Sequence, residues 1–407
     1  MKRRYRFPFG AMSVTDKAKE LVSKAMETGR LSSGSYVREF EAAFAKLIGT
    51  KEAVALSSGT DADALALAVL YDFGANRGDE IIVPALSFVA TGNAVLQAGF
   101  IPVFVDIESE TLNIDTSKIE AVITDKTKAI MPVHLMGKPA DMDAVNKIAK
   151  KHNLYVIEDA AEAHGSIYKG RAIGTLGDMA AYSLYVAHMI STVEGGVVVT
   201  DNNEYAKILR SLRSHGRACK CKICLLNTGD ADCGNRFDND QEMDIRFVFE
   251  RMGFSSKMNE LEAAIGLGNI EIYPEIFNKR RKNLKYLMDK FNEFKPYLVT
   301  IGEEEYEVIG PHALPIIVQE KAGFNRNELV RRLEEEGIDS RSLFLSMPTQ
   351  CSGFKFLGYK LGEFPNAEYM GHNGLHIGVH QDLSYEDLDY FLGVVRSFIK
   401  EKISLRR

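Results

Sequence analysis

AVALSSGTDADALALAVL, residues 53–70, joins a short apolar run to an apolar helical stretch through a turn of small polar residues. Ala53–Leu56 has the length and composition of a buried strand. Ser57–Thr60 ends the strand, and Ala62–Leu70 then predicts a helix. A strand followed at once by a helix is the unit from which parallel sheets are built.

The same alternation continues to residue 200. Helices are expected at Ala90–Gln97 and Met142–His152. This series predicts an α/β fold whose mostly parallel sheet is covered on both faces, with ligands at the carboxyl ends of the strands. Six further apolar runs predict the other strands: Glu80–Val83, Val103–Asp106, Ala129–Val133, Tyr155–Ile157, Met179–Leu184 and Val197–Thr200.

The character of the chain changes after residue 273. A basic helical segment over 275–292, a strand at Leu314–Val318 and a helix at Asn325–Glu336 predict a smaller α+β domain. We therefore expect a large domain over residues 1–273, which includes an N-terminal arm, and a small domain over 274–407. A polar segment at about 214–241 has the features of an inserted loop, and long loops are usually functional.

Composition excludes several classes of protein. The chain has 407 residues, 45% of them hydrophobic, and a net charge of −6, which is typical of a globular protein and does not favour a nucleic-acid partner. The longest apolar run, Ala64–Tyr71, is too short to span a membrane. No apolar stretch of signal-peptide length follows the basic start, so we expect a cytoplasmic protein with no membrane partner.

Two stretches suit a phosphate and an aromatic ring. Ser57–Thr60 lies between a strand and a helix, where free backbone N–H groups bind phosphate, although a plain serine helix cap explains a single such match better. Asp159 lies where another strand ends. It could keep a pyridine nitrogen protonated or cap the next helix, and the residues alone do not separate these two roles.

Ser183 and His188 follow the next strand. Ser183 could donate a hydrogen bond to a phosphate. His188 has a side chain that titrates near neutral pH when unperturbed, so it can serve as a general base. Taken alone, a histidine that simply forms a hydrogen bond within its loop is the better interpretation.

Four of the five cysteines fall within fifteen residues, at Cys219, Cys221, Cys224 and Cys233. A cytosolic chain does not normally cluster thiols for disulfides, so a metal or redox centre is favoured. Four thiolates suit zinc or an iron–sulfur cluster. Only Cys221 and Cys224 have the C-x-x-C spacing common in zinc sites, and both metals stay open. Cys351 is isolated and is expected in the core or a loop, or as a distant ligand.

Five ordered motifs are more specific than any of these signals alone: SSGT, SFVATGNAV, EDAAEAHGS, YSLYVAHMISTVEGG and GFSSKMNELEAAIGL. In this order they resemble the DegT/DnrJ family of nucleotide-sugar aminotransferases and dehydratases, and the resemblance covers nearly the whole chain. It implies the aspartate-aminotransferase fold (type I), with a seven-stranded, mostly parallel sheet in the large domain. It also implies a pyridoxal phosphate (PLP) or pyridoxamine phosphate (PMP) cofactor and a homodimer with shared active sites.

The resemblance also implies roles for individual residues. The cofactor phosphate would be held at Ser58, Gly59 and Thr60, with help from Ser183. Phe88 would stack on the ring, Asp159 would pair with the ring nitrogen, and Glu162, where most members have Gln, would lie near the ring hydroxyl. Ser255, where most members have Asn, and Lys257 would reach in from the partner subunit. Substrate contacts are expected from Arg213, His215, Arg341 and Gln350, because a guanidinium suits a diphosphate.

The resemblance departs from the aminotransferases at one position. They carry a lysine where this chain has His188, and no lysine occurs between Lys169 and Lys207. Without that amine the protein cannot form its own Schiff base with the cofactor. Histidine at this position is typical of the branch that contains the GDP- and CDP-4-keto-6-deoxysugar 3-dehydratases. There the cofactor is held non-covalently and the histidine acts as the base.

The branch therefore implies removal of the C3 hydroxyl from a nucleotide-linked 4-keto-6-deoxyhexose. One of its enzymes carries a [2Fe–2S] cluster at a similar chain position and takes electrons from a separate reductase, which favours iron–sulfur over zinc here and implies a reductase partner. Two alternatives remain: another PMP-dependent reaction on a sugar nucleotide, and a non-catalytic regulatory protein that retains the cofactor pocket.

Overall fold

A computed structural model of the chain describes residues 5–219, 221–222, 233–237 and 242–404. Its large domain is built on a seven-stranded sheet with the order β1-β9-β8-β5-β4-β2-β3. β9 is antiparallel to both of its neighbours and the other pairs are parallel, which confirms the predicted α/β class. The strands are β1 Glu52–Leu56, β2 Glu80–Pro84, β3 Ile101–Val105, β4 Thr127–Ile130, β5 Tyr155–Asp159, β8 Met179–Ser183 and β9 Gly196–Thr200.

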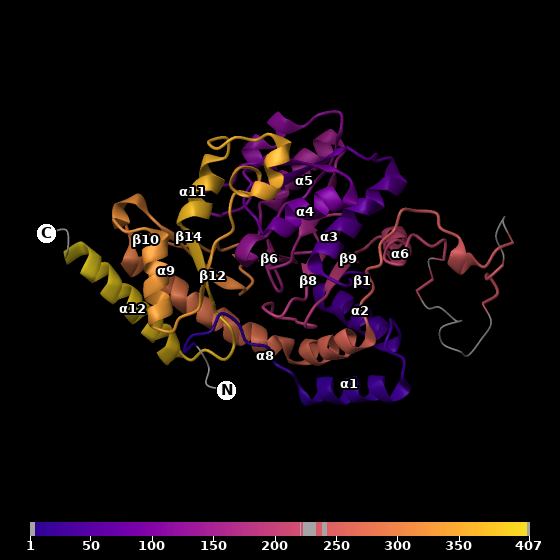
Figure 1. Cartoon of the computed structure of the whole chain (residues 1–407), viewed down its shortest axis with the longest axis horizontal. Helices are drawn as coiled ribbons and strands as arrows, with labels where there is room; N and C mark the ends of the chain where they lie inside the picture. Colours follow the sequence, from indigo (N-terminus) through magenta and orange to yellow (C-terminus); the bar gives the residue numbers. More distant parts are fainter. Residues whose placement is uncertain (1–4, 220, 223–232, 238–241, 405–407) are drawn as a thin grey trace.

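Helices cover both faces of this sheet (Figure 1). Val54 and Leu56 of β1 join the core on one face, and Ala53 and Ala55 join the core on the other. Successive strand residues point to opposite faces, so a run that is apolar throughout is buried on both sides. α3 (Gly59–Ala68), α4 (Val89–Ala98) and α6 (Asn203–Leu212) pack on the first face, and α2 (Ser35–Ile48), α5 (Met142–His152) and the first turns of α8 (Glu260–Phe291) pack on the second.

The small domain contains an antiparallel sheet with the order β10-β12-β14-β13, packed against α9 and α12 at the left of Figure 1. A three-stranded sheet, β11-β6-β7, joins it to the large domain. The elements are β10 Leu298–Val299, β12 Ala313–Val318, β13 Ser340–Ser342, β14 Gly374–Gly378, α9 Arg326–Glu335, α10 Met347–Gln350, α11 Pro365–Asn373, α12 Tyr385–Ser404, β6 Ile167–Tyr168, β7 Arg171–Ala172 and β11 Glu307–Val308.

The expected domain boundary at 273/274 falls inside α8, which runs unbroken from Glu260 to Phe291. Pro274 removes only one helical N–H donor, and the helix continues through it. The sequence pattern changes at this point because the helix passes from one core to another: Ala263 lies in the large-domain core, and Leu284 and Leu287 pack with small-domain residues. Figure 1 shows α8 crossing from beneath the sheet to the small domain.

The N-terminal arm also crosses this boundary. The Phe7 backbone N–H donates to the Gly337 carbonyl at 3.0 Å, and the Asp339 N–H donates to the Phe7 carbonyl at 2.8 Å. These bonds tie the start of the chain to the small domain rather than to the large domain in which residues 1–273 were expected. α1 (Asp16–Thr28) then runs beside α8.

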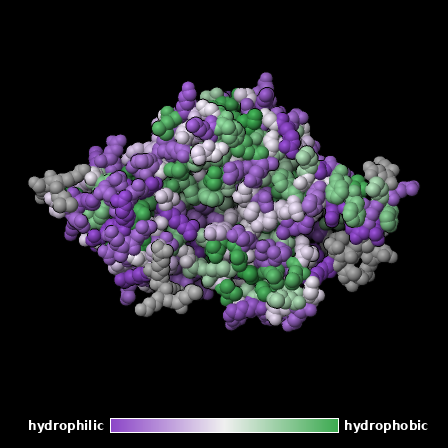
Figure 2. Space-filling view, viewed as in Figure 1, coloured by the Kyte–Doolittle hydropathy of each residue, from purple (hydrophilic) through white to green (hydrophobic). Residues whose placement is uncertain are grey.

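The inserted segment leaves and returns through a two-stranded ribbon. Ser214 pairs with Ser255 and Arg217 pairs with Phe249, so the insertion extends beyond the expected end at 241. It projects at the right of Figure 1, and Figure 2 shows hydrophobic groups at that end of the molecule. Exposed hydrophobic side chains of this segment are Phe237, Met243, Phe247, Phe249 and Met252.

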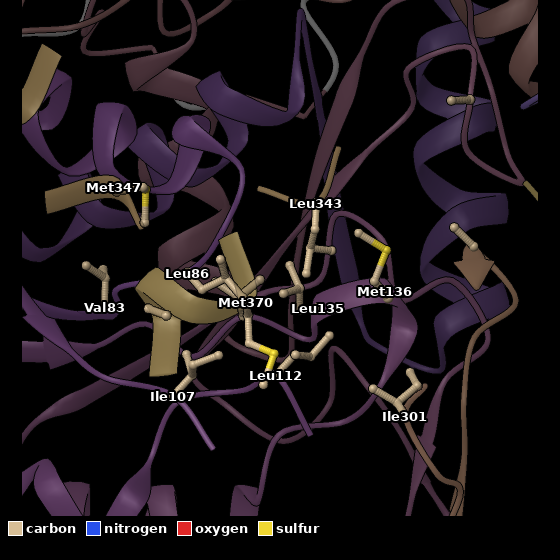
Figure 3. Close-up of a cluster of buried hydrophobic side chains, with 14 of the residues drawn as sticks. Val83, Leu86, Ile107, Leu112, Leu135, Met136, Ile301, Leu343, Met347 and Met370 are labelled. Atoms are coloured by element: carbon tan, nitrogen blue, oxygen red, sulfur yellow. The ribbon is translucent and has the colours of Figure 1, made fainter. Parts of the chain in front are cut away.

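Hydrophobic side chains from both domains pack together in a shared cluster (Figure 3). Leu86 and Leu135 come from loops that follow β2 and β4, and Leu343, Met347 and Met370 come from the small domain. This packing fixes the small domain over the carboxyl ends of the strands. No helix within the described ranges is long and apolar enough to cross a membrane.

Glu260 joins α8 to the start of α2. Its carboxylate is 3% exposed and accepts hydrogen bonds from the N–H groups of Gly34 (2.7 Å), Tyr36 (3.0 Å) and Val37 (3.0 Å). Glu260→Ala leaves three N–H groups without an acceptor and should lower the free energy of unfolding by about 2–4 kcal/mol in urea denaturation. Glu271→Ala, on an exposed position of the same helix, is the control, and an equal loss in both variants would contradict this role.

Candidate active site

A cavity of about 650 Å³ lies between the carboxyl ends of the strands and the small domain. Residues after β1, β5 and β8 line one side, and residues from the small domain line the other. Nine of the residues singled out from the sequence meet here: Ser58, Gly59, Thr60, Phe88, Asp159, Glu162, Ser183, His188 and Arg341.

One end of the cavity is formed by the first turn of α3. Ser58 caps this helix, and its hydroxyl accepts from the Asp61 N–H at 3.0 Å. A Cβ atom on Gly59 would lie 2.7 Å from Ser183 Cβ, so only glycine lets this turn approach β8 so closely. A helix N-terminus at a turn of small residues suits a phosphate.

Asp159 forms the floor of the cavity at the end of β5. It is 4% exposed and accepts hydrogen bonds from Thr91 Oγ1 at 2.7 Å and from the Ala161 N–H at 3.2 Å. Burial raises the pKa of its carboxyl. Its neighbour Glu158 points to the other face and is bonded to His134 at 3.1 Å and to three backbone N–H groups, so Glu158 is structural.

Above this floor, the Phe88 side chain is 56% exposed and lines the cavity, with its ring centroid 5.4 Å from that of Phe344. An exposed aromatic side chain at a cavity wall offers a stacking surface for a planar ring. The stacking role expected for Phe88 stays a prediction.

Glu162 pairs with a histidine from the other domain. Its carboxylate accepts from the Met136 N–H at 2.7 Å and lies 3.3 Å from His312 Nε2. Burial raises the pKa of Glu162 to about 8. A glutamine at this position would not exchange a proton with His312, whereas a carboxyl group can.

His188 lies at the centre of an imidazole cluster. Its ring centroid is 5.1 Å from that of His312 and 5.9 Å from that of His164. The pKa of His188 is lowered to about 3 by burial, and then by Arg280 and Arg341. Its Nδ1 atom has no hydrogen-bond partner among the described residues. The ring is therefore unprotonated near neutral pH, and its Nδ1 atom is not engaged by the described residues.

Five of the residues expected in the site lie outside the cavity lining. Ser255 and Lys257 are exposed and lie at the return of the ribbon. Arg213 pairs with Glu41 at 2.6 Å, and Gln350 bonds to the Glu368 carbonyl at 3.0 Å, so both are engaged within the fold. His215 is exposed beside the ribbon.

The cysteine segment is described only in part. Cys219 and Cys233 are half-buried and Cys221 is exposed, whereas Cys224 lies outside the described residues. Within the part of the chain that the structure covers, no group of three or more His, Cys, Asp or Glu side chains is placed to hold a metal ion. Cys351 is half-buried and packs against the core, as one of its expected roles requires.

Residues 13–396 match the model of the DegT/DnrJ/EryC1/StrS aminotransferase family. The chain belongs to this family. Lipopolysaccharide biosynthesis protein RfbH of Salmonella typhimurium is 34% identical to it, over 94% of this chain and 89% of that protein. The GDP-4-keto-6-deoxy-D-mannose 3-dehydratase of Escherichia coli O55:H7 is 32% identical, over 96% of this chain and 99% of its own.

The crystal structure of a GDP-4-keto-6-deoxymannose-3-dehydratase has a similar fold, with a TM-score of 0.85 and 31% identity, covering 96% of this chain and 100% of that one. That protein is a variant in which a histidine is replaced by asparagine, and it contains bound GDP-perosamine. The likeness confirms the aminotransferase-type fold.

The cavity of this DegT/DnrJ/EryC1/StrS family member fits a pyridoxal-type cofactor. It combines a helix N-terminus for phosphate, a stacking ring at Phe88 and a buried carboxyl at Asp159. Three residues that line it each have a buried atom with no partner among the described residues: Asp63 Oδ1, His188 Nδ1 and His376 Nδ1. A polar ligand would satisfy such atoms, which are otherwise costly to bury.

Sequence reasoning missed several cavity residues, among them Asp63, Thr91, His312 and His376. Asp63 lies in the 53–70 stretch, where a charged residue inside an otherwise apolar helix could have indicated a functional position. Thr91 lay inside the SFVATGNAV motif. His312 and His376 carry no local signal, because tertiary packing alone brings them to the site.

Asp159 and Asp63 offer a matched test of the cofactor site. Burial and the neighbouring Asp159 raise the pKa of Asp63 well above its usual range, which favours the uncharged form of its side chain. Asp159→Asn removes the charge that meets a pyridinium nitrogen and should weaken PLP binding at least about tenfold, as measured by fluorescence titration. Asp63→Asn keeps the shape of the side chain and should weaken PLP binding less than Asp159→Asn does. Equal weakening in both variants would contradict the assignment.

Proposed function

We propose that this protein is a PLP/PMP-dependent enzyme that removes the C3 hydroxyl from a nucleotide-linked 4-keto-6-deoxyhexose. One observation carries the proposal: the cavity has the features of an aminotransferase site, yet a neutral histidine lies in it and no lysine is among its described lining residues. The relatives named as 3-dehydratases and the sugar nucleotide bound in the similar structure support it.

The cofactor supplies an amine for the sugar ketone and a ring that accepts electrons. Ser58, Gly59, Thr60 and Ser183 would hold its phosphate. Phe88 would offer a stacking surface to the ring, Asp159 would pair with the ring nitrogen, and Glu162 would lie near the ring hydroxyl. Ser255 and Lys257, which are exposed in one protomer, are proposed to complete the site of the partner subunit.

His188 takes and returns the proton that the reaction moves. A neutral imidazole accepts a proton at a nitrogen and cannot form a Schiff base, whereas a lysine could do both. Because the ring is buried and unprotonated, it acts as a base throughout the physiological pH range.

Arg341 is the best-placed of the four expected substrate residues. It is exposed, lines the cavity and stacks 3.9 Å above the Phe9 ring centroid, where a diphosphate could reach its guanidinium. The other three are proposed to support the site without lining this cavity. Arg213 and Gln350 have partners within the fold, and His215 lies beside the ribbon.

A homodimer follows from the same proposal. The exposed hydrophobic side chains of the insertion and of α1, such as Met26 and Met252, are what a subunit interface would cover. The cysteine segment is proposed to hold a [2Fe–2S] cluster, with zinc as the alternative, and to receive electrons from a reductase.

The dehydration can be tested directly. The protein is incubated with PMP and a panel of 4-keto-6-deoxyhexose nucleotides, and the products are analysed by mass spectrometry and NMR. We expect loss of the C3 oxygen. His188→Asn should slow this at least about a hundredfold while still binding cofactor, because it removes only the base. A product that retains the C3 hydroxyl and gains an amine would instead establish an aminotransferase, which the family name makes the second candidate.

Metal content tests the cluster. Protein purified without oxygen should contain iron and acid-labile sulfide in equal amounts, and replacing Cys219, Cys221 and Cys233 with serine should abolish both. Stoichiometric zinc without sulfide would contradict an iron–sulfur centre, and the absence of any metal would leave the cysteines without a ligand role.

A further inference from the structure

Arg280 is a buried cation on α8, behind the residue proposed as the base. Its side chain is 2% exposed, and no carboxylate lies within ion-pair distance of it among the described residues. The carboxylate of Asp382 attracts Arg280 from beyond that distance, and a buried charge without a close counter-ion is costly even when it is hydrogen-bonded. Burial lowers the pKa of Arg280 to about 10, which leaves the guanidinium charged at neutral pH. A buried charge of this kind suggests that Arg280 has a function in addition to packing.

The hydrogen bonds of Arg280 lead to the turn that carries His188. Its Nη1 donates to the carbonyl of Ala187 at 3.4 Å, and its Nε donates to Gln381 Oε1 at 2.9 Å. Ala187 directly precedes His188, whose own N–H donates to the Tyr185 carbonyl at 2.9 Å. The turn is thus closed by the hydrogen bond to the Tyr185 carbonyl and is also bonded to the Arg280 guanidinium.

Gln381 extends this network to the N-terminal arm. Its Nε2 donates to the Ala11 carbonyl at 3.1 Å and to Ser13 Oγ at 3.3 Å. A Cβ atom on Gly10 would lie 3.9 Å from Ala187 Cα, so the arm contacts the turn of His188 itself. Arg280 therefore connects the small domain, the arm and the turn.

The surroundings of His188 contain more positive than negative charge. The groups facing it are His164 after β5, His312 before β12, Tyr185 on its own turn, Arg341 on β13 and Arg280 on α8. The nearby carboxyl group of Glu162 is paired with His312. No carboxylate in the described structure is bonded to the His188 ring, so nothing there favours an imidazolium.

We propose that Arg280 is a positioning residue that fixes the turn of His188 through the Ala187 carbonyl and, by its charge, adds to the burial that disfavours protonation of the imidazole. The inference uses the proposed function only for the role of His188 as base. The link between the guanidinium and the protonation state of the ring is independent of the substrate.

The protonation state can be measured in the full-length protein without cofactor. Histidine-labelled wild type, Arg280→Met and Arg280→Lys are titrated between pH 5 and 8 by NMR, and the His188 signal is identified by its loss in His188→Asn. We expect a neutral ring throughout in wild type and Arg280→Lys, and in Arg280→Met a shift of the His188 signal toward its imidazolium position at the acidic end, because the removal of the Arg280 charge raises the pKa of the ring. The neighbouring Arg281→Met, which removes an ion pair with Glu303, is the control and should leave the His188 signal unchanged.

Turnover of the loaded enzyme separates positioning from charge. Arg280→Lys keeps the charge but cannot reach both acceptors, so kcat should fall about tenfold with KM nearly unchanged. In Arg280→Met, the acidic limb of the kcat profile should move to higher pH. A His188 titration identical to wild type in a folded Arg280→Met protein would overturn the proposal; if that variant does not fold, an unchanged kcat in Arg280→Lys would overturn it. If the His188 signal moves as expected but wild type performs no dehydration, the proposed function fails and the inference stands.

Discussion

A carboxylate buried at the end of a central strand is costly unless a cation or hydrogen-bond donors meet it. Asp159 is in this position, and Thr91 and the Ala161 N–H satisfy it only in part. A protonated ring nitrogen would complete its environment, and in return the carboxylate would keep that nitrogen charged. The phosphate turn at Gly59 and the aromatic side chain of Phe88 lie on the same cavity. On the proposed function, the carboxyl group of Asp159 on β5 would set how a planar, phosphorylated cofactor is oriented.

On the proposed function, the same cavity would separate proton transfer from covalent capture of the cofactor. A lysine near a pyridoxal ring is both a base and a nucleophile toward the aldehyde, and these roles compete when the cofactor must leave or carry its amine to a sugar. His188 retains only the first role. Its burial and the two nearby guanidinium groups keep the ring neutral. No other group would therefore have to deprotonate His188 before it acts as the proposed base.

Local sequence pattern was sufficient for the sheet and for one wall of the cavity. Runs such as Ala53–Leu56 are apolar on both faces, and their ends place Asp159, Ser183 and His188 at one edge. The pattern was misleading at Pro274, because a long helix tolerates one missing donor once tertiary packing supports it. His312 and Arg280 were missed because their roles depend on contacts with residues about 90 to 150 positions away, which no local periodicity reports.

The most direct measurement concerns the bond that the protein is expected not to make. Protein saturated with pyridoxal phosphate is reduced with borohydride, freed of unbound cofactor, and examined by intact mass and peptide mapping, with His188→Lys as the positive control. Wild type should keep its unmodified mass, because the described cavity lining of one protomer contains no lysine and the partner subunit's Lys257 is proposed to help hold the cofactor rather than to replace a lysine at position 188, whereas the variant should gain a pyridoxyl group at position 188. Stoichiometric fixation of the cofactor in wild type would contradict the account.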